Sequence, residues 1–331
     1  MFDLSPYNTF GLHVQAREGL LVRGISDLKN VDAENSIIIG RGSDVLFTDD
    51  YDGLALINDI RDLKITQDQD SFIVEAGGGL ILDELIEDLL NQGICGLENL
   101  SAIPGTVGAA PVQNIGAYGV EIGSLIERVE CFDLRSHKVE VFSKDQCEFG
   151  YRTSYFKKHP QRSLFITKVV FRLSSLFNPI LEYKGLDEDG FSDALKVREK
   201  VIELREGKLP DPKVIGNAGC FFKNPIVDKD FALKLKSKYE NMPSYYVDDS
   251  SCKLAAGWLI DTAGCKGLIH GNVGTWKNQA LVIVNYGDAR PHEIVSLAKY
   301  IQCEVASKFG IDMEPEVRIY GHKGEISWES L

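Results

Sequence analysis

A glycine- and alanine-rich stretch, LSAIPGTVGAAPVQNIGAYGVEIG at residues 100–123, limits the folds open to this chain more than any other segment. Its small residues include Gly105, Gly108, Ala109, Ala110, Gly116, Ala117 and Gly119. Residues of this size let the backbone approach another group closely, and successive free N–H groups can form a nest for an anion. Charged residues are nearly absent, so amide dipoles would hold a phosphate here. A tightly packed loop without a ligand is the alternative that composition leaves open.

A second glycine turn, GRGSD at residues 40–44, lies between two short apolar runs. Its G-x-G pattern is similar to a dinucleotide-binding fingerprint, but the third glycine is missing and VLF follows at once. A Rossmann turn opens a helix whose N-terminus holds the pyrophosphate. Because VLF favours a strand, we do not expect a Rossmann fold. A plain hairpin turn would be the default interpretation if this segment stood alone.

Apolar alternation and helical spacing predict both strands and helices along the chain. The predicted strands lie within residues 36–47 (two strands around a turn), 54–59, 71–79, 126–143 (a hairpin turning near Ser136 and His137), 164–173, 279–287 and 314–321. The predicted helices cover residues 80–93, 191–212, 253–264 and 291–310. Gly93 is placed to end the first helix, and Pro210 and Pro212 to stop the second. The predicted fold class is α+β, with a glycine-rich sheet part and then a smaller α/β part.

The charge of the chain argues against some classes of partner. The 331 residues carry a net charge of −13, whereas nucleic acids require a basic surface. A few local Lys and Arg residues can still hold a small anionic ligand. No apolar run reaches the roughly 18–20 residues of a membrane span, and the N-terminus does not resemble a signal peptide. We therefore expect a cytoplasmic protein without nucleic-acid or membrane partners.

Cysteine and histidine spacing argues against a metal site. The seven cysteines include no C-x-x-C pair, and the six histidines are scattered. The odd cysteine count also argues against a disulfide framework. We expect reduced thiols and no metal.

Six motifs follow one another along the chain: GRGSDVLF, IPGTVGAAPVQNIGAYGVE, YRTSYF, KLPDPKVIGNAGCFFKNP, KLAAGWLID and EPEVR. Together they resemble the UDP-N-acetylenolpyruvoylglucosamine reductase (UDP-N-acetylmuramate dehydrogenase, MurB) family. The resemblance runs from NTFG at residues 8–11 to EPEVRIYG at 314–321, and its second and fourth motifs are long and specific. NPILEYKGL at residues 178–186 is similar to the Tyr-bearing, substrate-covering loop of the longer family type.

The resemblance implies a two-subdomain FAD-binding fold of the vanillyl-alcohol-oxidase (PCMH) type with a smaller α/β substrate-binding domain. The implied boundaries are residues 1–60 for the first FAD-binding subdomain, with a C-terminal return at 318–331, then 61–205 for the second and 206–317 for the substrate domain. The resemblance also implies FAD as cofactor with NADPH as hydride donor, and we expect a monomer that holds the flavin without a covalent bond. The reaction would reduce UDP-N-acetylglucosamine enolpyruvate to UDP-N-acetylmuramate for peptidoglycan synthesis.

That chemistry explains three residues that the resemblance implies are catalytic. Hydride addition to the enol ether builds negative charge beside the substrate carboxylate, and an acid must then quench this charge. Cys220, in GNAGCFFKNP, matches the position of the proton donor. Arg152, in GYRTSYF, would hold the carboxylate with its guanidinium fork. Glu316, in EPEVR, would hydrogen-bond the developing charge if it is protonated or bridged by water.

Each of these three residues has a plainer interpretation. Most family members carry serine at the position of Cys220, but a thiol is a far stronger acid than an alcohol, so a general acid is retained. Without its motif, Cys220 would be a small buried hydrophobe. Arg152 would be a surface ion-pair residue, and Glu316 would lie on the exposed face of an edge strand.

The resemblance implies further contacts. Those expected with FAD are Gly40, Arg41, Gly42, Ser43, Asp44, Pro104, Gly105, Thr106, Gly108, Ala109, Gln113 and Gly119. Those expected with the substrate are Tyr118, Tyr183, Lys208, Asn224, Lys266 and Gln279. Two positions depart from the family pattern. Asp44 replaces an asparagine, which adds a carboxylate near a pyrophosphate, and Trp276 stands where histidine is expected.

Two other functions are open to a chain with these glycine turns. A related FAD oxidoreductase acting on another alcohol or sugar should lack the pair GNAGCFFKNP and EPEVR. A non-catalytic flavin or nucleotide-sugar binding protein should lack Arg152 or Glu316. Because all of these are present, the sequence favours the reductase.

Overall fold

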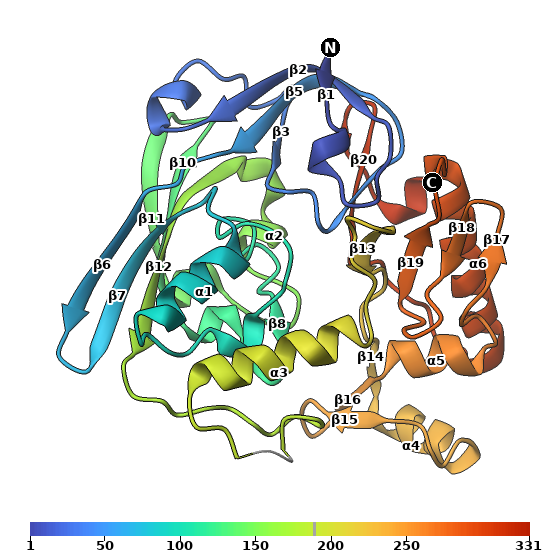
Figure 1. The fold of residues 1–331 in the computed structure, drawn as a ribbon. Coiled ribbons are helices and arrows are strands. Elements are labelled where there is room, and N and C mark those ends of the chain that lie inside the picture. The colour runs from blue at the N-terminus through green and yellow to red at the C-terminus, as the bar shows by residue number, and fades with distance from the viewer. Residues whose placement is uncertain (188–189) are drawn as a thin grey trace. The chain divides into compact units, whose positions relative to one another are not determined.

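The computed structural model describes residues 1–187 and 190–331, and this part of the chain divides into two compact units (Figure 1). Unit 1 comprises Met1–Phe2, Ala16–Arg41 and Asp52–Gly207. Unit 2 comprises Asp3–Gln15, Gly42–Tyr51 and Lys208–Leu331. Two short N-terminal stretches therefore belong with the C-terminal third of the chain.

Unit 1 contains a four-stranded and a five-stranded sheet, apart from single residues at strand ends that belong to unit 2. The first sheet has the order β1 (Phe2–Asp3), β2 (Gln15–Val22), β5 (Tyr51–Asn58), β3 (Ser36–Ile39). The second has the order β11 (Lys138–Ser143), β10 (Ile126–Asp133), β12 (Leu164–Ser174), β7 (Ser71–Gly77), β6 (Leu63–Asp68). Strands β3 and β5 are parallel, whereas all neighbours in the second sheet are antiparallel. A short pair, β8 (Gly116–Ala117) and β9 (Val120–Glu121), lies in the glycine-rich stretch.

Helix α1 (Leu82–Asn91) follows the apolar spacing of the sequence. Its buried residues are Leu82, Leu85, Ile86, Leu89 and Leu90. They form one hydrophobic core with residues of the five-stranded sheet such as Val74 and Val129. Gly93 follows the helix with a φ of 75°, a conformation that glycine adopts without a steric cost. The predicted helix and its glycine stop are confirmed.

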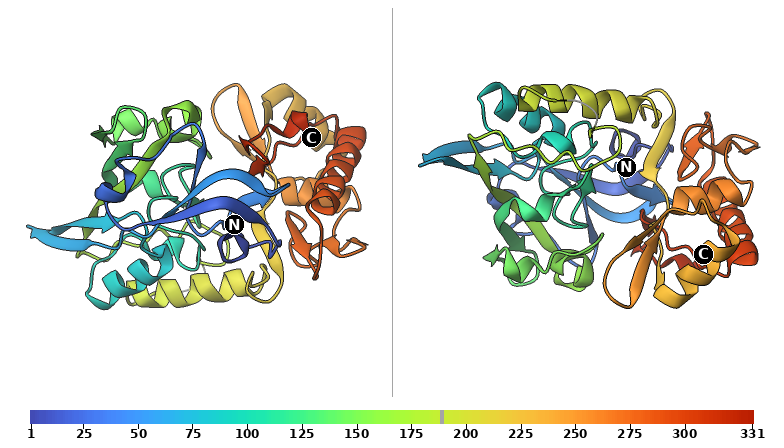
Figure 2. Two further views of the ribbon diagram at one scale, coloured as in Figure 1. Left: turned by 90° about the horizontal axis from the view of Figure 1, so that it is seen from above. Right: turned by 90° about the horizontal axis from the view of Figure 1, so that it is seen from below.

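Helix α3 (Ala194–Glu206) lies beside α1 (Figure 1, Figure 2) and is shorter than the predicted range 191–212. Its N-cap residue Asp193 accepts a hydrogen bond from the N–H of Lys196 at 3.0 Å. The helix ends before Pro210, which lacks an N–H and disfavours helical backbone at the preceding residue. Helix α2 of unit 1 is short (Tyr155–Lys158).

The described part of unit 2 contains three small sheets. The first has the strand order β13 (Gly216–Cys220), β19 (Val282–Asn285), β18 (Val273–Thr275), β17 (Ile269–His270). The second has the order β14 (Ile226–Asp228), β16 (Ser251–Leu254), β15 (Ser244–Tyr246). The third has the order β21 (Gly324–Glu325), β20 (Arg318–Gly321), β4 (Val45–Phe47). The helices are α4 (Lys229–Lys238), α5 (Ala256–Thr262) and α6 (Pro291–Phe309). Strand β4 pairs with β20 in parallel, so segments from opposite ends of the sequence lie side by side.

Three local predictions are wrong. Lys253 and Leu254, predicted to begin a helix, belong to β16, which pairs on both sides with β14 and β15. The predicted strand 314–321 begins only at Arg318. The GRGSD turn is not a hairpin, because β3 and β4 pair with different strands, β5 and β20. A strand does follow that turn, as expected for a chain without a Rossmann fold, and the α+β class is confirmed.

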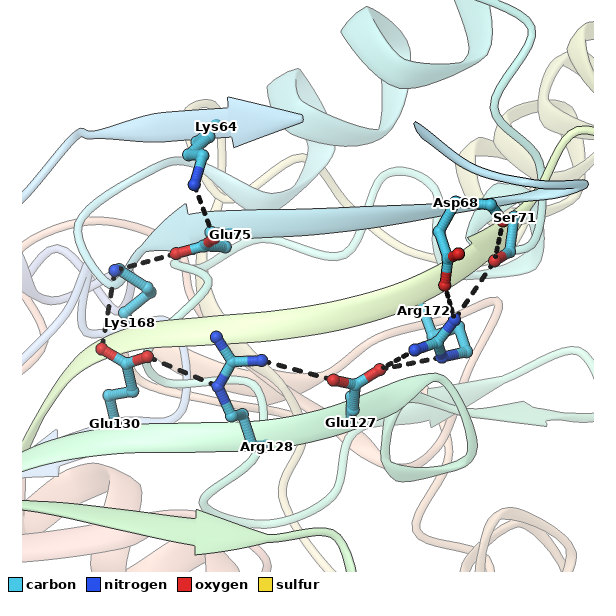
Figure 3. A network of polar contacts seen from close by, with 9 residues as sticks. All are labelled: Lys64, Asp68, Ser71, Glu75, Glu127, Arg128, Glu130, Lys168 and Arg172. Carbon is cyan, nitrogen blue, oxygen red and sulfur yellow. Dashed lines mark hydrogen bonds and ion pairs between the residues drawn. The ribbon is translucent and has the colours of Figure 1, made fainter. Parts of the chain in front are cut away.

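Ion pairs connect the strands of the five-stranded sheet on its outer face (Figure 3). Lys168 on β12 lies 3.1 Å from Glu75 on β7 and 3.5 Å from Glu130 on β10. Arg172, farther along β12, lies 2.8 Å from Glu127 on β10. Opposite charges thus face one another across neighbouring strands, which supports the register that the buried face also specifies.

Within residues 1–187 and 190–331, no helix is both long and apolar enough to cross a membrane. All seven cysteines lie in these residues, and none is joined to another by a disulfide. The same residues contain no cluster of three His, Cys, Asp or Glu side chains that could hold a metal ion.

Candidate active site

The turn that follows β3 lies against the glycine-rich stretch within unit 1. A Cβ added to Gly40 would lie 2.7 Å from Thr106 Oγ1 and 3.5 Å from Ala109 Cβ. Thr106 is buried, and its hydroxyl has no hydrogen-bond partner among the described residues. Within those residues, the N–H groups of Gly105 and Thr106 donate to no main-chain carbonyl. An unsatisfied buried hydroxyl and two unused amides fit the phosphate or carbonyl oxygens of a cofactor such as FAD.

The expected nest of free amides is wrong for the next part of the loop. The N–H of Gly108 donates to Gly78 O at 2.8 Å, and the N–H groups of Ala109 and Ala110 donate to Thr106 O. A Cβ at Gly108 would also lie 3.0 Å from Gly78 Cα. Small residues at 108–110 therefore serve close backbone packing, which was the alternative interpretation of this stretch.

Two residues of the first glycine turn have structural roles in unit 2. Gly42 has a φ of 61°, and a Cβ there would lie 1.8 Å from the carbonyl oxygen of Tyr7, so glycine is required. The carbonyl oxygen of Asp44 accepts a hydrogen bond from the N–H of Arg318 at 3.0 Å. Burial lowers the pKa of Arg318, but neighbouring groups that include Asp44 raise it above its ordinary value. The added carboxylate at Asp44 therefore has a nearby cation.

Arg152 lies in a tight turn of unit 1. Its φ is 52°, in the left-handed region that residues other than glycine rarely adopt. Gly150 and Thr153 exchange main-chain hydrogen bonds across the turn, and buried Asn114 donates from Nδ2 to Gly150 O at 3.1 Å. Nη2 of Arg152 donates to Gly116 O at 3.4 Å. The turn thus holds the arginine against the glycine-rich stretch, and such strain is typical of functional sites.

Cys220 and Glu316 lie on neighbouring segments of unit 2. Cys220 ends β13 after a bulge and directly follows Gly219, which has a φ of 72°. The N–H of Glu316 donates to the carbonyl oxygen of Phe221 at 2.7 Å. Both Cys220 and Glu316 are partly buried. The thiol is therefore not part of the closed core, and Glu316 precedes β20 instead of lying on its exposed face.

Two predicted substrate residues, Tyr118 and Tyr183, meet within unit 1. Their ring centroids are 4.9 Å apart in an edge-to-face arrangement. Tyr118 is buried and has a φ of 49°, whereas Tyr183 is exposed. Burial raises the pKa of the Tyr118 phenol, while Arg205 lowers it and Tyr183 raises it. The structure therefore joins the glycine-rich stretch to the segment expected to cover the substrate.

Two other predicted substrate residues meet at the start of α5 in unit 2. Oδ1 of Asn224 accepts a hydrogen bond from the first N–H of that helix at 2.9 Å. Oε1 of Gln279 lies 2.8 Å from where a Cβ on Gly257 would be. Lys266, by contrast, forms an ion pair of 2.9 Å with a residue near the other end of α5. Lys208 is exposed in the segment that follows α3.

The other predicted positions vary in exposure. Arg41, Pro104, Ala109 and Gly119 are exposed, and Ser43 is partly buried. Oε1 of Gln113 accepts a hydrogen bond from Lys157 at 3.3 Å. Within the described residues, the buried Nε1 of Trp276 has no hydrogen-bond partner.

Sequence reasoning did not identify three buried asparagines that hold these loops. Asn58 donates to Ile166 O at 2.8 Å, and Asn114 fastens the turn of Arg152. Asn99 donates to two carbonyls of separate loops. The sequence signal for such a residue is an asparagine inside an apolar stretch. A carboxamide that is buried there needs hydrogen-bond partners, so it connects neighbouring segments.

Comparisons with known proteins agree with these features. The family described as UDP-N-acetylenolpyruvoylglucosamine reductase, C-terminal domain, matches residues 211–320, and the FAD binding domain family matches residues 29–140. The chain is 40% identical over 333 residues to the UDP-N-acetylenolpyruvoylglucosamine reductase of Escherichia coli O157:H7, covering 98% of this chain and 97% of the relative. It is 39% identical over 337 residues to that of Pasteurella multocida (strain Pm70), covering 99% of each. Among solved structures, UDP-N-acetylenolpyruvylglucosamine reductase (MurB) from Thermus caldophilus is similar, with a TM-score of 0.67, 25% identity and 96% of each chain covered.

Proposed function

Because the chain belongs to the UDP-N-acetylenolpyruvoylglucosamine reductase family, we propose that it reduces UDP-N-acetylglucosamine enolpyruvate to UDP-N-acetylmuramate, a peptidoglycan precursor. The enzyme is a flavin-dependent oxidoreductase that uses FAD, with NADPH as the reductant. The main support for the proposal is that the chain is similar over nearly its full length to reductases of that name.

FAD is held without a covalent bond by the turn at Gly40 and the loop around Thr106. The unsatisfied hydroxyl of Thr106 and the N–H groups of Gly105 and Thr106 would hold it by donating hydrogen bonds. The missing side chain at Gly40 leaves room beside that hydroxyl. Bound FAD would supply the flavin chemistry by which a hydride passes from NADPH to the substrate. The remaining FAD contacts stay as predicted from the sequence.

Arg152 holds the substrate carboxylate with paired N–H donors and stabilises the charge that grows beside it. Its strained turn fixes the guanidinium before the substrate arrives, so little reorganisation is needed during the reaction. Glu316 hydrogen-bonds the same developing charge, either in its protonated form or through a bridging water molecule, because an ionised carboxylate in direct contact would repel that charge.

Cys220 supplies the proton that completes the reduction. Its S–H bond breaks, the proton forms a C–H bond at the carbon next to the one that received the hydride, and the thiolate takes a new proton from water. Partial exposure of Cys220 is consistent with both substrate access and reprotonation.

The two lysines, Lys208 and Lys266, supply point charges for the pyrophosphate of the nucleotide sugar. Asn224 and Gln279, together at the start of α5, bind its polar groups, as do Tyr118 and Tyr183. We assign residues 1–60 with 318–331, and 61–205, to the two FAD-binding subdomains, and 206–317 to the substrate domain. We expect the enzyme to act as a cytoplasmic monomer without nucleic-acid or membrane partners.

A visible spectrum of the purified protein tests this proposal. Without air, NADPH should bleach the flavin absorbance, and UDP-N-acetylglucosamine enolpyruvate should restore it. A protein that bleaches but does not recover with this sugar would point to a flavin oxidoreductase with another substrate. A colourless protein that cannot be reconstituted with FAD would rule out the proposed reaction.

A further inference from the structure

Asn99 joins two loops of unit 1 through a single side chain. It lies in a short 3-10 helix, η3 (Glu98–Leu100), and is 1% exposed. Its Nδ2 donates to Tyr118 O at 2.7 Å and to Ile180 O at 2.8 Å. A carboxamide nitrogen carries two hydrogens, so both of its donors are used on these two carbonyls.

The same two loops touch at two further places. The side chain of Ile180 approaches Gly119, where an added Cβ would lie 3.3 Å from the Ile180 Cγ2 atom. The rings of Tyr118 and Tyr183 meet edge to face. The left-handed backbone of Tyr118 and Gly119 sets the direction of the carbonyl that Asn99 binds. Asn99 therefore joins the main chain of Tyr118 to that of Ile180, in the segment that also carries Tyr183.

The far end of the covering segment has a separate anchor. Leu186 is fully buried and packs with Tyr118 and with Val197 and Val201 of α3. Before that anchor, Ile180 is 46% exposed and Tyr183 is 42% exposed. Leu181 packs against the same cluster, but the rest of residues 178–183 is largely exposed. Because such surface segments open at low free energy, the hydrogen bonds from Asn99 to Tyr118 O and to Ile180 O contribute to the position of this segment.

We propose that Asn99 is a positioning residue that fastens residues 178–183 onto the Tyr118 loop, and that this closed position sets the affinity for the nucleotide sugar. The inference rests on the proposed function, in which Tyr118 and Tyr183 contact that substrate. Asn99 itself does not touch the reacting atoms. Its carboxamide is required because one group must donate to two carbonyls at once.

The substitution Asn99→Asp removes the hydrogen-bond donors of the side chain and keeps its shape. Aspartate has nearly the same volume but no N–H, and its ionised oxygens would face two carbonyl oxygens. Asn99→Ser keeps at most one donor and is the milder variant if Asn99→Asp does not fold. Thr167→Val is the matched control, because it also removes a hydrogen bond from a buried side chain of unit 1 to a main-chain carbonyl, from Thr167 Oγ1 to Glu130 O at 3.0 Å, without touching either loop.

Steady-state kinetics give the first readout. With full-length holoenzyme, Asn99→Asp should raise the KM for the enolpyruvyl sugar by about tenfold or more, the equivalent of one or two lost hydrogen bonds. Its flavin content, its reduction by NADPH and its kcat should change less, to within about threefold. Thr167→Val should keep the wild-type KM. A parallel loss of NADPH reduction, flavin and thermal stability would overturn the proposal, because it would show a general structural role.

Limited trypsin digestion without substrate gives the second readout. Lys184 is exposed next to Tyr183, so loosening of the segment should speed cleavage after Lys184 in both Asn99 variants and leave Thr167→Val unchanged. Unchanged cleavage together with an unchanged KM would overturn the proposal. Digestion needs no sugar, so it tests whether Asn99 fastens the segment independently of the reaction. Failure of the wild-type protein to reduce the sugar would refute the proposed function and leave the digestion result valid.

Discussion

The main-chain N–H of Glu316 donates a 2.7 Å hydrogen bond to the carbonyl oxygen of Phe221, the residue that follows Cys220. Phe222 and Pro315 form an antiparallel bridge at the next position. Main-chain hydrogen bonds therefore hold two residues of distant motifs in a defined register. Because these bonds are made by the main chain, the register of the two segments should persist when Cys220 or Glu316 is substituted.

Replacing the thiol should separate the two half-reactions. In Cys220→Ala, NADPH should still reduce the flavin at the wild-type rate, since no proton from Cys220 is needed there. Reoxidation by the enolpyruvyl sugar should slow by about 10²- to 10⁴-fold, the usual contribution of a general acid. Stopped-flow absorbance measures both steps. Cys220→Ser, which restores an O–H donor, should recover much of the loss, and normal reoxidation in Cys220→Ala would refute the assignment.

Alkylation should inactivate this enzyme through one cysteine. Five of the seven thiols are buried, while Cys220 is partly buried and Cys303 is exposed. Iodoacetamide should therefore abolish turnover of the wild type, and Cys220→Ser should resist it. Cys303→Ser is the matched control and should remain sensitive. Equal inactivation of wild type and Cys220→Ser would show that the reactive thiol lies elsewhere.

Arg152→Lys should impair only the step that involves the sugar. Lysine keeps the charge but cannot form the paired fork with a carboxylate. We expect sugar-dependent flavin reoxidation to fall by about 10²-fold or more, as for loss of a preorganised donor, with reduction by NADPH unchanged. Arg61→Lys, at an exposed ion pair with Asp59, should behave as wild type. A similar loss in both half-reactions would instead indicate damage to the flavin site.

Gly40→Ala should weaken FAD binding. The added Cβ would lie 2.7 Å from Thr106 Oγ1, in the space of the proposed FAD site beside that hydroxyl. The flavin-to-protein ratio after purification, and the FAD concentration needed for reconstitution, measure the effect. Gly24→Ala is the control, because its Cβ would meet nothing closer than 3.7 Å. Wild-type flavin content in Gly40→Ala would place the cofactor away from this turn.

Asp83→Asn should lower stability in a pH-dependent way. Burial alone would raise the pKa of Asp83, but hydrogen bonds from Arg198 and from the N–H of Ala102 hold it below its ordinary value of 3.8. Because the pKa of Asp83 is lower in the folded than in the unfolded protein, the carboxylate stabilises the fold above pH 3.8. This stabilisation is lost as the pH falls through the pKa of the folded protein. Arg198 is buried while Asp83 remains partly solvated, so we expect a cost of about 1–3 kcal/mol at pH 7, between exposed and buried pairs.

Urea titrations of wild type and Asp83→Asn at several pH values measure this difference. The gap in unfolding free energy should be constant from pH 7 to pH 5 and should shrink in more acidic solution. Lys196→Gln, which removes an exposed pair with Glu199, is the control and should show almost no gap. A gap that widens as the pH falls would contradict the assigned direction of the pKa shift.

Local pattern alone determined much of this protein. The buried stripe of α1 and its stop at Gly93 follow from spacing within a few turns, as does the strand after GRGSD that argued against a Rossmann fold. The motifs likewise indicated the reductase family, because they are contiguous segments that need no knowledge of their neighbours.

Tertiary structure decided the features whose partners are remote in the sequence. Lys253 and Leu254 have helical spacing, yet strands on both sides draw them into β16. The sequence predicted free N–H groups at residues 108–110, but these groups donate hydrogen bonds to the carbonyl oxygens of Gly78 and Thr106. The carboxamide of Asn99 bonds carbonyls of Tyr118 and Ile180, which lie far from each other in the sequence, so the sequence alone did not indicate this contact. Buried hydrogen-bonding groups must be satisfied, and the chain's path through space, more than local pattern, selects which groups satisfy them.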